Sequence, residues 1–222
     1  MKRGIKVGFW IGGCLIALFV IWTVLVCTYD VRAIGPLGSS VGFASINSRF
    51  RDFVGVNFTL YEITDVLGLI PIGTALGFAI LGLWEWISRK SIFKVDFSLL
   101  MLGIFYAVVI LIFIMFEKLA INYRPVLIDG VKEASYPSST TLLTACVMPS
   151  AIVQFKMRVR SACTRRVLIS LSYAFLAFMI AGRILSGVHW FSDIVGGALI
   201  SAGLVVIYFN VCKIKHKEFK DG

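Results

Sequence analysis

His189 and Asp193 are the pair of residues in this sequence best suited to catalysis. They stand four positions apart, so on a helix they share one face. A carboxylate that accepts a hydrogen bond from one ring nitrogen of a histidine leaves the other nitrogen free to act as a nucleophile or a base. Such a pair is the orienting half of a catalytic triad. The other histidine, His216, lies in a basic segment near the C-terminus and is interpreted as a solvated tail residue.

Basic and hydroxyl-bearing residues that could hold a phosphoryl group accompany this pair. Guanidinium groups match phosphate oxygens bidentately, and hydroxyl groups and backbone amides at a helix N-terminus supply further donors. Such residues gather in three stretches, 117–125, 135–141 and 182–193. The candidates for phosphate binding are Lys118, Arg124, Ser138, Ser139, Thr140 and Arg183.

Each stretch taken alone also fits a simpler interpretation. Lys118 and Arg124 could be interfacial anchors whose side chains extend to lipid head groups. Ser138 could be the N-cap of a helix, and His189 could be bonded to Ser186 or to a backbone carbonyl. The combination favours a functional site, because ionisable groups gathered at one membrane level are costly and usually functional.

The composition predicts that membrane-spanning helices position these residues. Of the 222 residues 59% are hydrophobic and the mean hydropathy is +0.90, which leaves too little polar surface for a soluble domain. A hydrocarbon core about 30 Å thick requires about 20 apolar residues per helix. We therefore expect an all-α integral membrane bundle of about six transmembrane helices, at 7–27, 66–87, 97–117, 139–155, 167–184 and 191–212.

The basic residues predict the orientation of this bundle. The net charge is +10, but the cations lie in short clusters between apolar runs and not on one solvated face, so a nucleic-acid binder is excluded. Most of them fall on the cytoplasmic side if the N-terminus is inside. We expect a multi-pass protein of the cell membrane with both termini cytoplasmic. All three polar stretches then lie on the extracytoplasmic side.

The chain is interpreted as a single membrane domain, 1–222. Residues 28–65 are expected to form an extracytoplasmic segment, with a turn near Gly35-Pro36 and then a short surface helix within 43–60. Residues 213–222 are expected to form a basic cytoplasmic tail. The five scattered cysteines predict neither a disulfide framework nor a metal site. The oligomeric state is left open.

The three polar stretches resemble the three-part signature of the type 2 phosphatidic acid phosphatase family, the membrane lipid phosphate phosphatases. That signature is Lys, six residues, Arg-Pro; then Pro-Ser-Gly-His; then Ser-Arg, five residues, His, three residues, Asp. The third part matches best, with Arg183, His189 and Asp193 at the family spacing. The resemblance covers about 65–212, which would be a phosphatase-like core.

The resemblance implies a phosphatase acting on a membrane lipid. His189 would attack phosphorus to form a phosphohistidine and Asp193 would orient it. Lys118, Arg124, Ser138 and Arg183 would hold the phosphate oxygens, and neither a metal nor another cofactor is implied. Catalysis would rest on positioning and on stabilisation of charge in the transition state.

Three positions depart from the family pattern. Only five residues separate Lys118 from Arg124, Gly182 replaces a serine, and Thr140 stands where the family has a second histidine that protonates the leaving oxygen. A diphosphate releases a phosphate monoester, whose second pKa is about 6, and so needs little protonation. We therefore expect lipid diphosphates such as a polyprenyl diphosphate to be preferred. The alternative is a catalytically impaired phosphatase-like protein that binds or carries lipid phosphates.

Overall fold

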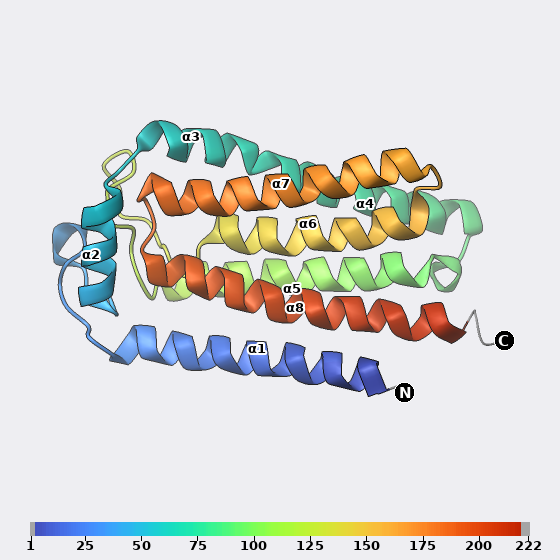
Figure 1. Ribbon diagram of the computed structural model, residues 1–222, viewed down its shortest axis with the longest axis horizontal. Helices are drawn as coiled ribbons and strands as arrows, with labels where there is room; N and C mark the ends of the chain where they lie inside the picture. The colour runs from blue at the N-terminus through green and yellow to red at the C-terminus, as the bar shows by residue number, and fades with distance from the viewer. Residues whose placement is uncertain (1–2, 219–222) are drawn as a thin grey trace.

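The computed structural model describes residues 3–218, with side chains as far as residue 214. In this part of the chain the regular structure is helical, and only isolated β-bridges occur outside the helices. The chain is an all-α membrane bundle (Figure 1). Its α-helices are α1 (Arg3–Thr28), α2 (Ala44–Val54), α3 (Phe58–Leu67), α4 (Leu69–Arg89), α5 (Phe97–Leu119), α6 (Ser139–Arg158), α7 (Ala162–Ser186) and α8 (Phe191–Glu218). Two short 3₁₀ helices, Pro36–Gly38 and Ile92–Lys94, lie in connections.

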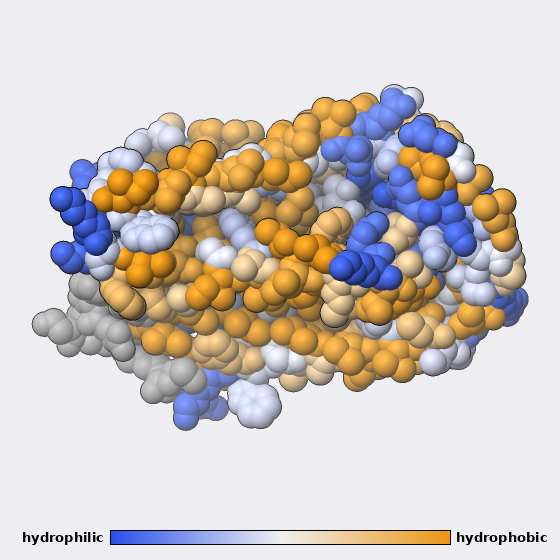
Figure 2. All heavy atoms as spheres, turned by 180° about the vertical axis from the view of Figure 1, so that it is seen from behind, coloured by the Kyte–Doolittle hydropathy of each residue, from blue (hydrophilic) through white to orange (hydrophobic). Residues whose placement is uncertain are grey.

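Five helical stretches within the described residues are long and apolar enough to cross a membrane. They are Arg3–Thr28, Phe58–Arg89, Phe97–Leu119, Ala162–Ser186 and Phe191–Ile214. Figure 2 shows hydrophobic residues covering the middle of one face, with most hydrophilic residues toward the two ends. This distribution is the one expected of a chain whose middle faces lipid, and it confirms the predicted fold class.

The predicted span at 139–155 forms α6, which differs in character from the other five. It is polar for a membrane helix, with Thr144, Ser150 and Gln154 fully buried along it. It packs against α5, α7 and α8 (Figure 1). Neighbouring helices therefore cover its polar groups, which explains why it is less apolar than the five lipid-facing stretches.

The structure corrects the predicted boundary between the surface segment and the second span. The surface helix is α2 alone, whereas residues 58–67 form α3, which continues through Gly68 into α4. Asn57 begins α3, because its side-chain oxygen accepts a hydrogen bond from the Leu60 amide at 2.9 Å. The acidic residues Glu62 and Asp65 interrupt the apolar run, so hydropathy alone placed the start of the span at 66.

The C-terminal part of the chain also differs from the prediction. Helix α8 continues to Glu218, so residues 213–218 extend the last helix and do not form a separate tail. The remainder of the predicted basic tail, 219–222, lies outside the described residues. Helices α1 and α8 run antiparallel to each other along the bundle, so that α1 begins and α8 ends at the same end (Figure 1).

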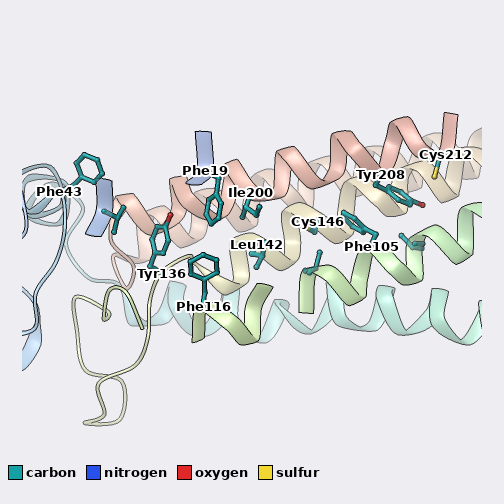
Figure 3. Packing of buried hydrophobic residues seen from close by; sticks show 13 residues of the cluster. Phe19, Phe43, Phe105, Phe116, Tyr136, Leu142, Cys146, Ile200, Tyr208 and Cys212 are labelled. Atoms are coloured by element: carbon teal, nitrogen blue, oxygen red, sulfur yellow. The ribbon is translucent and has the colours of Figure 1, made fainter. Parts of the chain in front are cut away.

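Close helix packing fixes the frame of the bundle. Helix α1 lies along α8, and a Cβ built on Gly12 or Gly203 would lie 3.2 Å from a backbone oxygen of the other helix. Small residues permit such close approach between membrane helices. Farther along, the rings of Phe19, Phe116 and Tyr136 pack together, with centroids 5.6 to 6.3 Å apart (Figure 3). Tyr136 thereby anchors the long connection between α5 and α6 against the helices.

Candidate active site

The three polar stretches come together at one end of the bundle. There α7 ends at Ser186 and α8 begins at Phe191, so that His189 lies in the short connection between them. The Ser138 amide, at the start of α6, donates a hydrogen bond of 3.0 Å to the Asp193 carbonyl. The ends of α6, α7 and α8 are thus joined by the backbone. Helix α2 lies across the same end (Figure 1).

His189 is buried, with 3% of its surface exposed, and each of its ring nitrogens has a hydrogen-bond partner. Nε2 lies 3.2 Å from Arg124 Nη1, and Nδ1 lies 3.0 Å from Ser135 Oγ. A guanidinium can only donate, so Nε2 accepts and carries the lone pair, and the proton is on Nδ1. The nitrogen available for attack therefore faces Arg124.

Ser135 lies between His189 and Asp193. Its hydroxyl accepts from His189 Nδ1 and donates a short hydrogen bond to Asp193 Oδ2. The sequence suggested a direct contact between the two catalytic candidates, but the structure places a hydroxyl in the chain between them. Asn122 Nδ2 donates to Asp193 Oδ1 at 3.0 Å, and the Trp190 amide donates to Oδ2 at 3.1 Å. These donors fix the carboxylate in one orientation.

The surroundings keep His189 uncharged. Burial and the nearby positive charges of Arg124 and Arg183 hold the pKa of His189 well below its usual value of about 6.5. At neutral pH the imidazole is therefore neutral, and Nε2 can act as a nucleophile.

Arg183 provides unpaired hydrogen-bond donors inside the site. Its side chain is 1% exposed, and its Nη2 donates to Asp65 Oδ1 at 2.8 Å and to the Thr140 hydroxyl. Its Nε and Nη1 are buried and have no partner among the described residues. An unpaired buried donor costs about 1–3 kcal/mol, so these two donors on one guanidinium are left in need of an acceptor.

The second arginine, Arg124, is paired on two sides. Its Nε lies 2.9 Å from a carboxylate oxygen of Glu133, and its Nη1 contacts His189. The Tyr61 ring lies next to both guanidiniums, 5.6 Å from Arg124 Cζ and 5.1 Å from Arg183 Cζ. Two cations, one aromatic ring and one neutral imidazole therefore converge on one small region.

The remaining predicted residues lie at different distances from this centre. Thr140 contacts Arg183, and the buried Ser138 accepts a hydrogen bond of 3.1 Å from the Thr141 hydroxyl. Ser139 lines a small cavity beside Glu117. Lys118 is exposed at the end of α5, and within 3–218 no hydrogen bond or ion pair joins it to the other candidates.

Five residues that contact this group were not among the predicted site residues. Asn122, Glu133 and Ser135 fall in or beside the quoted stretches, and a polar residue close to a motif was the only available signal for them. Tyr61 and Asp65 lie far away in sequence, on α3. An acidic residue just before an apolar run was the signal at Asp65. Among the described residues no group of three or more His, Cys, Asp or Glu side chains is placed to hold a metal ion.

The positions of these residues agree with a known family. Residues 118–216 match the family model of the PAP2 superfamily. The match begins at Lys118 and includes His189 and Asp193, whereas Tyr61 and Asp65 lie before it.

A solved structure has the same fold. It is the crystal structure of a transmembrane PAP2 type phosphatidylglycerolphosphate phosphatase from Bacillus subtilis. The TM-score is 0.62 at 18% identity, over 92% of this chain and 96% of that chain. No curated protein sequence gives a significant match. The family match supports phosphoric-ester hydrolase activity, and the solved structure shows the shared fold.

Proposed function

We propose that this protein is a membrane phosphatase that hydrolyses a lipid phosphate or diphosphate through a phosphohistidine intermediate on His189. The observation that carries the proposal is the pairing of a neutral Nε2 with the guanidinium of Arg124, beside the two unpaired donors of Arg183. A tetrahedral phosphoryl group has the acceptors that these donors lack. Its phosphorus would then lie next to the lone pair of Nε2.

The reaction would proceed in two displacements. Nε2 of His189 attacks phosphorus, the bond from phosphorus to the bridging oxygen breaks, and the lipid leaves with that oxygen. The ring becomes positively charged as the N–P bond forms, and the hydrogen-bonded chain through Ser135 to Asp193 stabilises that charge. Water then attacks the phosphohistidine, the N–P bond breaks, and inorganic phosphate is released. Arg124 and Arg183 stabilise the charge on the equatorial oxygens in both steps.

We propose a lipid diphosphate, such as a polyprenyl diphosphate, as the preferred substrate. Thr140 offers Arg183 a hydroxyl but cannot replace an imidazolium as a proton donor. Losing a general acid costs about 100- to 10,000-fold in rate, and mostly when the leaving oxygen is strongly basic. The lipid monophosphate that leaves a diphosphate is a weak base. The absence of a histidine at position 140 therefore affects a diphosphate least.

We also propose that the site faces the extracytoplasmic side. Helix α1 begins and α8 ends at the opposite end of the bundle from His189 (Figure 1). Basic residues of the sequence concentrate toward that opposite end and so favour placing both termini in the cytoplasm. The substrate would then enter from the outer leaflet.

Phosphate release by detergent-purified protein tests this function. A polyprenyl diphosphate and phosphatidic acid are compared without added metal, in the wild type, in His189→Ala, and in His216→Ala as the matched histidine control. We expect release that is faster from the diphosphate, lost in His189→Ala and kept in His216→Ala. Binding without release by the wild type would indicate the phosphatase-like binder instead. Faster release from phosphatidic acid would contradict the diphosphate preference.

A further inference from the structure

Helix α3 reaches the site because of a glycine in α7. A Cβ built on Gly182 would lie 2.5 Å from Thr64 Cγ2, and the Thr64 side chain is fully buried. Helices α3 and α7 are in contact along this line (Figure 1). Any residue larger than glycine at position 182 would push α3 away. The glycine that departs from the family signature is thus the residue that admits α3.

The closeness of α3 brings two of its polar side chains to the arginines. Tyr61 and Asp65 are four residues apart and share one helix face. Asp65 pairs with Arg183, while the half-buried Tyr61 ring lies within 5.6 Å of the Cζ atoms of Arg183 and Arg124. Among the described residues the Tyr61 hydroxyl has no hydrogen-bond partner. The ring that carries this unpaired hydroxyl therefore lies beside both of the arginines proposed to bind phosphate.

The two carboxyl groups that pair with the arginines are bound as acceptors. Asp65 lies 2.8 Å from Arg183 and is 59% exposed, and Glu133 lies 2.9 Å from Arg124 and is 40% exposed. Both carboxyl groups are therefore engaged as acceptors by guanidiniums, which have only donors to offer.

Two other side chains near the connection between α5 and α6, those of Tyr136 and Lys118, carry a proton that could be donated, but neither is hydrogen-bonded to the arginines. The Tyr136 hydroxyl is hydrogen-bonded to Thr23 at 2.7 Å, inside the aromatic cluster of Figure 3. Lys118 is exposed at the end of α5. Tyr61 is thus the tyrosine that contacts both arginines and keeps an unpaired hydroxyl.

We propose that Tyr61 is a catalytic residue that protonates the leaving oxygen, the task for which position 140 lacks a histidine. This role rests on the proposed phosphatase function. As Nε2 of His189 attacks, the bond from phosphorus to the leaving oxygen breaks and the Tyr61 proton moves to that oxygen. In the second step the Tyr61 phenolate takes a proton from the attacking water, so that the cycle ends with neutral tyrosine. Arg124 and Arg183 lie near enough to stabilise the transient phenolate.

This role predicts a dependence on the leaving group. A phenol is a weaker acid than an imidazolium, so the preference for diphosphates persists in the wild type. A monoester expels a strongly basic alkoxide and depends on the Tyr61 proton. The lipid monophosphate that leaves a diphosphate does not.

The test is kcat/KM of Tyr61→Phe on phosphatidic acid and on a polyprenyl diphosphate. Phenylalanine keeps the ring against both guanidiniums and removes only the hydroxyl. Tyr29→Phe is the matched control, because Tyr29 is an exposed tyrosine outside the site. We expect Tyr61→Phe to lose about 100-fold on phosphatidic acid and less than about threefold on the diphosphate, with Tyr29→Phe unchanged on both.

Three outcomes overturn the assignment of Tyr61 and leave the phosphatase function intact. Equal losses on both substrates would show that the hydroxyl only supports the architecture, and no loss on either would show that it has no role. Wild-type protein that hydrolyses the diphosphate but shows no turnover of phosphatidic acid would also overturn it. Wild-type protein inactive on both substrates overturns the phosphatase function itself, and with it this inference.

Discussion

Replacing Ser135 by alanine removes the hydroxyl that links His189 to Asp193. The change leaves the Nδ1 proton of a buried imidazole without its acceptor, while Asp193 keeps its hydrogen bonds from Asn122 and Trp190. When Nε2 attacks phosphorus, the ring becomes positive, so the missing bond is one to a charged group. Such bonds contribute about 1.5–3 kcal/mol. With a tenfold change in rate for each 1.36 kcal/mol, kcat/KM should fall about 10- to 160-fold.

The assay is initial phosphate release from a polyprenyl diphosphate by purified protein in detergent. Ser88→Ala, a change at an exposed serine near the opposite end of the bundle, serves as the matched control. The thermal unfolding midpoint of each variant separates a loss of catalysis from a loss of folding.

A double-mutant comparison with Asp193→Asn shows whether the two residues act as one unit. If Ser135 acts through Asp193, the double variant should be no slower than the slower single variant, within about threefold. Losses that multiply, or a Ser135→Ala variant that keeps the wild-type rate, would refute the relay.

Two further outcomes follow from the geometry around His189 and Gly182. Gly182→Ala should displace α3 and lower kcat/KM about 10- to 100-fold. Adding Thr64→Ala should restore most of the activity, because it removes the methyl group that clashes with the new side chain. A Gly182→Ala variant with the wild-type kcat/KM would contradict the close contact. Because the pKa of His189 is lowered, its imidazole should stay neutral as the pH falls through about 6.5 and become charged only below that value. Nitrogen NMR of ¹⁵N-histidine-labelled His216→Ala protein, which retains a single histidine, measures this directly, and a midpoint at or above 6.5 would contradict the buried position.

The arrangement of helices was predictable wherever apolar runs were uninterrupted. The spans at 7–27, 97–117, 167–184 and 191–212 coincide with α1, α5, α7 and α8. The second span was placed too late, because Glu62 and Asp65 reduce hydropathy without ending the helix. The free-energy cost of placing these two carboxylates in a long apolar helix is small, because they lie near the end of the bundle, where Asp65 pairs with Arg183.

The motif residues were found from sequence because their spacing is local, and their partners were not because those contacts are tertiary. His189 and Asp193 were found from their interval of four, although His189 lies in the connection before α8 and reaches Asp193 through Ser135. Ser135 reaches them across 54 and 58 residues, and Tyr61 reaches Arg183 across more than a hundred. Residues at such separations meet only through helix packing, which periodicity does not encode. The close packing of Gly182 against Thr64 is also a tertiary contact and could not be predicted. In the sequence, Gly182 shows only that a hydroxyl of the family signature is missing.

Trapping of the covalent intermediate tests the central claim most directly. Purified protein is mixed with a lipid diphosphate carrying ³²P in its terminal phosphate, quenched in alkali within the first turnover, and digested for peptide identification. We predict label on the peptide that contains His189, with neither label nor phosphate release in His189→Ala. Label on a different residue, or undiminished turnover by His189→Ala, would contradict attack by His189.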